Sequence, residues 1–279
     1  MSARLISRYV DDPRIVTAIV AILISGALWF ATWQSMSGMM DMDMDGGAMG
    51  GMGANTGAQG MAGMSGMAMA AHDWSAATIW STIAMWVLMM AAMMLPSMAP
   101  VMAIYAGIAA KEDRGARLAA RITLFTTGYF LLWAIFSVGA AFGQLGLRSS
   151  EWFTMGGTLA LPVAGGVLLI VAGAYQFTTV KEFCLAHCRH PLTYLMSHWR
   201  EGLEGAFPVG ARHGVYCLGC CIALMGLMFV FGAMNVAWMA AIALYFLAEK
   251  ILPRAEIWSR IAGGLLIAAG LVMIIRDII

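Results

Sequence analysis

All five cysteines of the chain fall into two short clusters that repeat one spacing. The first cluster offers Cys184, His187 and Cys188, and the second offers Cys217, Cys220 and Cys221. In each cluster the side chains stand at positions i, i+3 and i+4, which share one face of a helix. Thiolates and imidazoles are ligands for Cu(I), Zn²⁺ or an iron–sulfur centre rather than for Mg²⁺ or Ca²⁺. The spacing therefore predicts a metal site, with buried thiols that only fill space as the alternative.

Two further histidines, His190 and His213, lie beside these clusters and complete the predicted Cys/His ligand set. Three thiolates and one imidazole satisfy Zn²⁺ as well as copper, so a structural zinc site stays open at this point. Beyond His213 and Glu249, no convincing general base accompanies the clusters. The pattern therefore favours a binding protein over an enzyme.

A second set of soft ligands fills the stretch 34–73, which is rich in methionine and glycine and holds no lysine or arginine. A glycine-rich segment without periodicity has no core for methionine to fill, so its thioethers need another purpose. Thioether sulfur selects Cu(I), and closely spaced sulfurs can share one ion. An adhesive or low-complexity linker is the alternative. The predicted ligands here are Met36, Met39, Met40, Met42, Met44, Met61, Met64, Met67, Met69 and His72.

The apolar stretch that follows, about residues 75–110, carries a third group of methionines. Met89, Met93, Met94 and Met98 are the predicted ligands, although packing explains methionines in a membrane helix equally well. Pro96 and Pro100 each remove a backbone donor and are expected to kink this helix. Broken membrane helices often line binding sites or conduits.

The composition indicates a polytopic membrane protein. Of the 279 residues, 61% are hydrophobic and 11% are charged, with a mean hydropathy of +0.81. A nucleic-acid partner is not expected. We predict an all-α bundle of about seven transmembrane spans, near 15–33, 75–110, 119–145, 159–175, 215–231, 236–248 and 261–275. Six spans are the alternative, if the last pair is re-entrant. The connector 192–203 is expected to be an amphipathic helix on the membrane surface, and Gly139 and Gly143 a small-residue packing face.

The distribution of basic residues predicts the orientation. With the N-terminus inside and the spans alternating, fourteen of the sixteen lysines and arginines fall on the inner side. This predicts a cytoplasmic N-terminus, a periplasmic C-terminus, and cysteines at the cytoplasmic edge, where thiols stay reduced. Three regions result: a first anchor (1–33), a periplasmic Met/Gly-rich loop (34–73) and a metal-binding helical domain (74–279).

Several stretches resemble bacterial integral membrane proteins that are catalogued as predicted metal-binding proteins of unknown function. They are Trp86 to Pro100, Tyr175-Gln176 with Lys181, Cys184 to Pro191, His213 to Cys221, and Glu249-Lys250. The resemblance covers about residues 75–275 and implies a shared metal site. The methionine-rich loop lies outside it. In its chemistry, though not in its fold, the chain is also similar to eukaryotic high-affinity copper transporters, which combine external methionines, membrane methionines and an internal Cys/His trap.

Together these patterns predict a copper-binding protein of the bacterial inner membrane. In this hypothesis Cu(I) is captured by the methionine-rich loop and handed to the Cys/His site, for uptake or delivery, with membrane lipids, metal ions and a metallochaperone as partners. Sharing soft ligands along the way avoids exposing a bare ion to lipid. The alternative is an accessory, copper-loading subunit of a membrane oxidase or monooxygenase complex.

Overall fold

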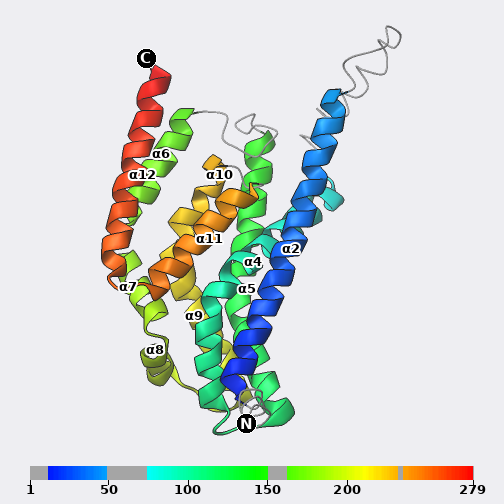
Figure 1. Ribbon diagram of the computed structural model, residues 1–279, viewed down its shortest axis with the longest axis vertical. Helices are drawn as coiled ribbons and strands as arrows, with labels where there is room; N and C mark the ends of the chain where they lie inside the picture. Colours follow the sequence, from blue (N-terminus) through cyan, green and yellow to red (C-terminus); the bar gives the residue numbers. More distant parts are fainter. Residues whose placement is uncertain (1–11, 49–73, 150–161, 232–234, 279) are drawn as a thin grey trace, which may run out of the picture.

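The computed structural model describes residues 12–48, 74–149, 162–231 and 235–278, and every regular element in these ranges is a helix. Side chains are not described for 35–48, 148–149 and 278. The helices are α2 (Pro13–Ala48), α4 (Ala76–Ala109), α5 (Gly115–Ser149), α6 (Pro162–Tyr175), α7 (Thr179–Arg189), α8 (Pro191–His198), α9 (Gly202–Gly226), α10 (Met228–Phe231), α11 (Val236–Ile251) and α12 (Ala255–Ile278). The long helices run along the long axis of the molecule, and α2 begins at the opposite end from the end of α12 (Figure 1).

Local sequence explains where several helices begin. The Ser75 hydroxyl caps α4, and the Thr178 hydroxyl accepts from the Lys181 N–H at the start of α7. The Asn235 side chain accepts from two N–H groups at the start of α11. Pro191 occupies the first turn of α8, where its missing donor costs nothing.

Five helical segments are long and apolar enough to cross a membrane: Pro13–Gln34, Ala76–Ala109, Gly115–Leu147, Gly202–Phe231 and Ala255–Asp277. A sixth arises if α6 and α7, which meet at a bend of 64°, form one broken span. The predicted span 236–248 is present as α11, which has 16 residues and falls short of the length for a span. The predicted all-helical architecture is thus confirmed, with five to six candidate spans among the described residues in place of about seven.

Three boundaries differ from the sequence-based prediction. Helix α2 continues to Ala48 through the first methionines of the methionine-rich stretch, which are good helix formers, although glycine and aspartate between them are poor ones. The predicted surface helix 192–203 is instead broken between His198 and Gly202. Helix α9 therefore starts at Gly202, well before the predicted start of the fifth span at residue 215.

Close helix packing positions the two cysteine-bearing helices. A Cβ placed on Gly210 of α9 would lie 1.9 Å from the carbonyl oxygen of Phe125, so only glycine lets α9 lie this close to α5. Gly128 of α5 approaches the Phe207 carbonyl in the same way. The prediction for Gly139 and Gly143 was wrong, because nothing lies within 4 Å of a Cβ at either position. The α5–α9 contact instead uses Gly128 of α5 and Gly210 of α9.

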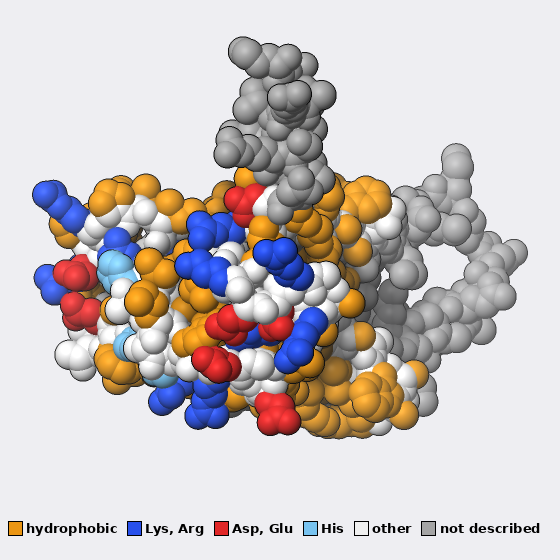
Figure 2. Space-filling view, turned by 90° about the horizontal axis from the view of Figure 1, so that it is seen from below, with side chains coloured by type: hydrophobic (Ala, Val, Ile, Leu, Met, Phe, Trp, Pro, Cys, Tyr) orange, Lys and Arg blue, Asp and Glu red, His pale blue; other side chains and the backbone are white. Residues whose placement is uncertain are grey.

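A buried guanidinium fixes the polar end of the bundle. Arg121 of α5 is fully buried, and its Nη1 lies 2.6 Å from Glu112 and 2.8 Å from Asp113 in the turn after α4. Its Nη2 donates to the carbonyl of Arg200, and its guanidinium covers the ring of Trp199 at 4.8 Å. These contacts tie the start of α9 to the α4–α5 turn. Figure 2 shows charged side chains and histidines gathered on this end of the molecule.

Candidate metal centre

The structure brings cysteines of the two predicted clusters together between α7 and α9. All five are free thiols and buried. The Sγ atoms of Cys188, Cys217 and Cys220 all lie within 4.8 Å of one another, and the Cys188–Cys220 separation is 4.0 Å. Three sulfurs that surround one ion at about 2.3 Å stand about 4 Å apart. Cys188, Cys217 and Cys220, which we call the thiol group, therefore have the dimensions of a three-sulfur site.

The other two cysteines flank the thiol group. The Cys221 Sγ lies 3.4 Å from the Cys220 Sγ. The Cys184 Sγ lies 2.7 Å from the position that a Cβ on Gly219 would take, so this glycine admits the Cys184 side chain against α9. The Tyr175 hydroxyl also donates to the Gly219 carbonyl oxygen, at 2.6 Å. The first predicted triad is therefore split, with Cys188 in the thiol group and Cys184 beside it.

The predicted histidines occupy three different environments, and none belongs to the thiol group of the described residues. His187 is partly buried, with its Nδ1 2.8 Å from the Phe183 carbonyl, and His190 is exposed. His213 is buried one helical turn before Cys217, and its Nδ1 has no hydrogen-bond partner among the described residues. A buried imidazole nitrogen without a partner is a group that a metal ion would satisfy.

Two aromatic rings hold His213 in place. The Tyr129 ring lies 5.8 Å from the imidazole, and the same phenol contacts the Cys217 Sγ at 3.1 Å. The Tyr194 ring lies 5.1 Å away on the other side. Burial raises the pKa of the Tyr194 phenol, which stays protonated and donates to the Val209 carbonyl at 2.7 Å. His213 is thus close to the thiol group but held between tyrosines.

A lysine beside the thiol group was not predicted as part of the site. The Lys250 Nζ lies 3.3 Å from the Cys217 Sγ and donates to the Ser97 hydroxyl at 2.9 Å. This side chain points into the bundle and joins α11, α9 and α4. An ammonium at this position favours thiolates, the form in which cysteine binds metal.

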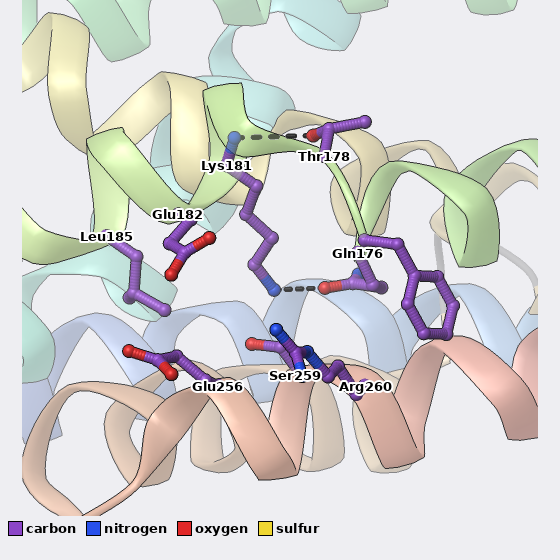
Figure 3. A pocket seen from close by; sticks show the side chains of 9 residues that line it. Gln176, Thr178, Lys181, Glu182, Leu185, Glu256, Ser259 and Arg260 are labelled. Atoms are coloured by element: carbon purple, nitrogen blue, oxygen red, sulfur yellow. Dashed lines mark hydrogen bonds between the residues drawn. The ribbon is translucent and has the colours of Figure 1, made fainter.

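The neighbouring residue, Glu249, belongs to a separate buried network. Its Oε1 lies 2.5 Å from the Lys181 Nζ and 2.6 Å from the hydroxyls of both Tyr245 and Ser259. Lys181 also donates to Gln176. Figure 3 shows Lys181, Gln176 and Ser259 meeting at a small cavity of about 30 Å³ between α7 and α12. Lys181 and Glu249 are both buried, and a buried charge is costly without an opposite charge beside it. Each of the two side chains provides that opposite charge for the other.

The predicted methionines of α4 are all in the core. Met89, Met93, Met94 and Met98 are at most 1% exposed, and α4 continues through Pro96 and Pro100. Trp86 packs on Phe229 of α10 at one end of an α4 face, and Ser97 contacts Lys250 at the other. Helical spacing puts Met93 and Met94, and also Met90, on this face between those two contacts. These methionines therefore lie along α4 between the contact with Phe229 and the contact with Lys250.

The remaining predicted methionine ligands cannot be followed to their side chains. Met36, Met39, Met40, Met42 and Met44 lie on the last turns of α2, where only the backbone is described. Met61, Met64, Met67, Met69 and His72 lie in 49–73, outside the described residues.

The thiol group lies far along α9 from the start of that helix. Cys217 is fifteen residues from the start of α9, which at 1.5 Å per residue is about 22 Å along the helix. The thiol group is thus deep in the bundle. Three thiols, a nearby unpaired imidazole and a row of thioethers form a set that fits a soft ion such as Cu(I).

Comparison with known protein families gives one match. A family model described as "Copper chaperone" and named PpoB2 matches residues 83–273, about two-thirds of the chain. The matched region includes every cysteine, Lys250 and the α4 methionines from Met85 onward. No curated protein and no solved structure matches the chain.

Proposed function

The chain belongs to the PpoB2 copper chaperone family, and from this premise we propose that it carries Cu(I) through the membrane to the thiol group. The methionine-rich stretch 34–73 collects the ion on the periplasmic side of a bacterial inner membrane. The α4 thioethers pass the ion inward, and Cys188, Cys217 and Cys220 receive it. The observation that carries the proposal is the convergence of these three thiols from two helices.

The ligand types support copper as the cargo. Cu(I) prefers soft sulfur ligands and accepts a low coordination number, which three thiols in a dry site provide. The thiol group of the described residues contains no carboxylate. Zn²⁺ favours four ligands in a closed tetrahedron, and two candidates for a fourth are the buried His213 and Cys221, whose Sγ lies 3.4 Å from the Cys220 Sγ. A structural zinc therefore remains the competing occupant, and the metal content of the protein distinguishes the two.

The arrangement along α4 supports an inward direction of transfer. The methionine-rich stretch precedes α4 in the chain, and Met90, Met93 and Met94 lie between the start of α4 and the contact of Ser97 with Lys250. Transfer from thioethers to thiolates is downhill, because a thiolate binds Cu(I) more strongly than a neutral sulfur. The proposed orientation, with the N-terminus in the cytoplasm, rests on the asymmetry of lysine and arginine.

The first experiment measures metal content. Full-length protein is purified after growth with both copper and zinc, and compared with the Cys217→Ser and Cys220→Ser variants. We expect about one copper per chain in the wild type and a loss of most of it in both variants. The Cys184→Ser variant tests whether the flanking thiol is required. Stoichiometric zinc that survives copper supplementation would contradict the proposal.

A second experiment tests the route along α4. A Met93→Leu/Met94→Leu variant removes both sulfurs and nearly keeps the volume of the core. Each exchange should therefore lower the free energy of unfolding by less than about 1.5 kcal/mol. We expect slower arrival of Cu(I) at the thiols in reconstituted vesicles. The control is Met102→Leu on the same helix, because Met102 lines an apolar groove with α2 and α5. Equal rates in the two variants would count against the thioether route.

The family description favours delivery of copper to another protein. As a second candidate function we propose that this recipient is a membrane oxidase or monooxygenase complex. A chaperone delivers its ion to another protein, so it need not move copper across the bilayer. Isotopic copper uptake into sealed vesicles separates the two functions. Uptake by the protein alone supports transport, whereas binding without uptake supports loading of a partner.

A further inference from the structure

An ion bound by the buried thiol group must leave along a path between side chains. A pocket at the polar end of the molecule adjoins α7, the helix that carries Cys188. This pocket is a cavity of about 250 Å³ between α7 and α8. It is lined by Ala186, His187, His190, Thr193, Tyr194 and Ser197. Histidine side chains are visible among the charged groups on this end (Figure 2). Two imidazoles thus line an open pocket beside the helix that carries Cys188.

The His187 ring is held in the orientation of a ligand. Its Nδ1 lies 2.8 Å from the Phe183 carbonyl, which can only accept, so Nδ1 carries the proton and Nε2 keeps its lone pair. The ring also stacks on Tyr216, with centroids 4.3 Å apart and planes 12° from parallel. A carbonyl that fixes the tautomer of an imidazole is the usual partner of a metal-binding histidine.

A short series of side chains connects the pocket with the thiol group. His187 directly precedes Cys188, a member of that group. The Tyr194 ring forms part of the pocket wall and lies 5.1 Å from the buried His213 ring on its inner side. His213 in turn is one helical turn from Cys217, and its Nδ1 has no partner among the described residues. Tyr194 and His213 therefore connect the pocket wall with the turn of α9 that precedes Cys217.

We propose that the pocket is the exit port of the thiol group, in which His187 and His190 take the ion from Cys188 and present it to an acceptor protein. The inference rests on the proposed function and adds the place of release. Each step is a ligand substitution: on the way into the pocket metal–nitrogen bonds form as the metal–sulfur bonds to the thiol group break, and on release metal–sulfur bonds to the acceptor form as the metal–nitrogen bonds break. Copper remains Cu(I) throughout. The acceptor is a protein with thiolate ligands, since transfer from imidazole to thiolate is downhill.

The test measures release separately from binding. Full-length protein in detergent is loaded with one equivalent of Cu(I) without oxygen, and bathocuproine disulfonate is added in a stopped-flow instrument. In the His187→Phe/His190→Gln variant, phenylalanine keeps the stacking on Tyr216 and removes the nitrogen ligand. We expect the equilibrium affinity for Cu(I) to stay the same and the release rate to fall by at least about tenfold.

A matched control and a second variant make the result decisive. His198→Ala removes a neighbouring histidine that does not line the pocket and whose Nδ1 is bonded within α8, so its release rate should match the wild type. His190→Gln alone changes an exposed residue and should slow release without affecting the fold. Unchanged release in the double variant overturns the port. A loss of affinity in that variant also overturns it, because the histidines would then belong to the primary site. Failure to bind Cu(I) in the wild type would instead refute the proposed function.

Discussion

Replacing Lys250 with methionine tests the electrostatic design of the thiol group. The change removes an ammonium that lies 3.3 Å from the Cys217 Sγ and leaves a side chain of similar length. At that distance, unit charges attract by about 5 kcal/mol at an effective dielectric constant of about 20. The bound Cu(I) repels the ammonium, but three thiolates leave the complex with an excess of two negative charges, so part of the attraction survives.

We therefore expect Lys250→Met to weaken Cu(I) binding by about 2 to 4 kcal/mol, or about 30- to 1,000-fold in Kd. The assay is an anaerobic competition titration of the full-length protein against a chromophoric Cu(I) chelator. Lys250→Arg keeps the positive charge and should lose much less affinity. Circular dichroism checks that both variants are folded. A methionine variant that binds as tightly as the wild type would refute the idea that the ammonium stabilises the thiolates.

Two further predictions concern the stability of the bundle. Lys181→Met and Glu249→Gln should each lower the free energy of unfolding by about 3 to 5 kcal/mol, because each leaves a buried charge without its partner. The double variant should lose less than the sum of the two, and strict additivity of the apparent unfolding temperatures would contradict this. Gly210→Ala should lower the free energy of unfolding by about 1 to 3 kcal/mol, because the added Cβ would clash with the Phe125 carbonyl. Gly139→Ala on α5 is the control and should change the free energy of unfolding by less than about 0.5 kcal/mol. Equal losses of stability in the two variants would contradict the view that the α5–α9 contact requires glycine at position 210.

The chemistry of the site could be predicted from local spacing. The repeated cysteine pattern gave the two halves of the thiol group, and hydropathy gave the helical bundle, because both signals lie within single helices. The geometry of assembly could not be predicted in this way. Whether Cys184 or Cys188 belongs to the thiol group depends on how α7 packs against α9. In the structure Cys184 packs on Gly219 of α9, whereas Cys188 lies with Cys217 and Cys220.

The partners of the thiols were the least accessible to sequence reasoning. Tyr129 lies 88 residues from Cys217 in the chain, and Ser97 lies 153 residues from Lys250. No periodicity connects such residues. The inward orientation of Lys250 could not be predicted, because a lysine near a helix end usually extends to the membrane surface. Only its hydrogen bonds to Ser97 and Cys217 reveal the inward direction.

The most direct test of the account is X-ray absorption at the copper edge of the full-length protein, loaded with one equivalent of Cu(I) under reducing conditions. We predict a first shell of three sulfurs, reduced in number when Cys188, Cys217 or Cys220 is changed to serine. A shell dominated by nitrogen or oxygen, or a spectrum that these substitutions leave unchanged, would contradict copper binding by the three thiols.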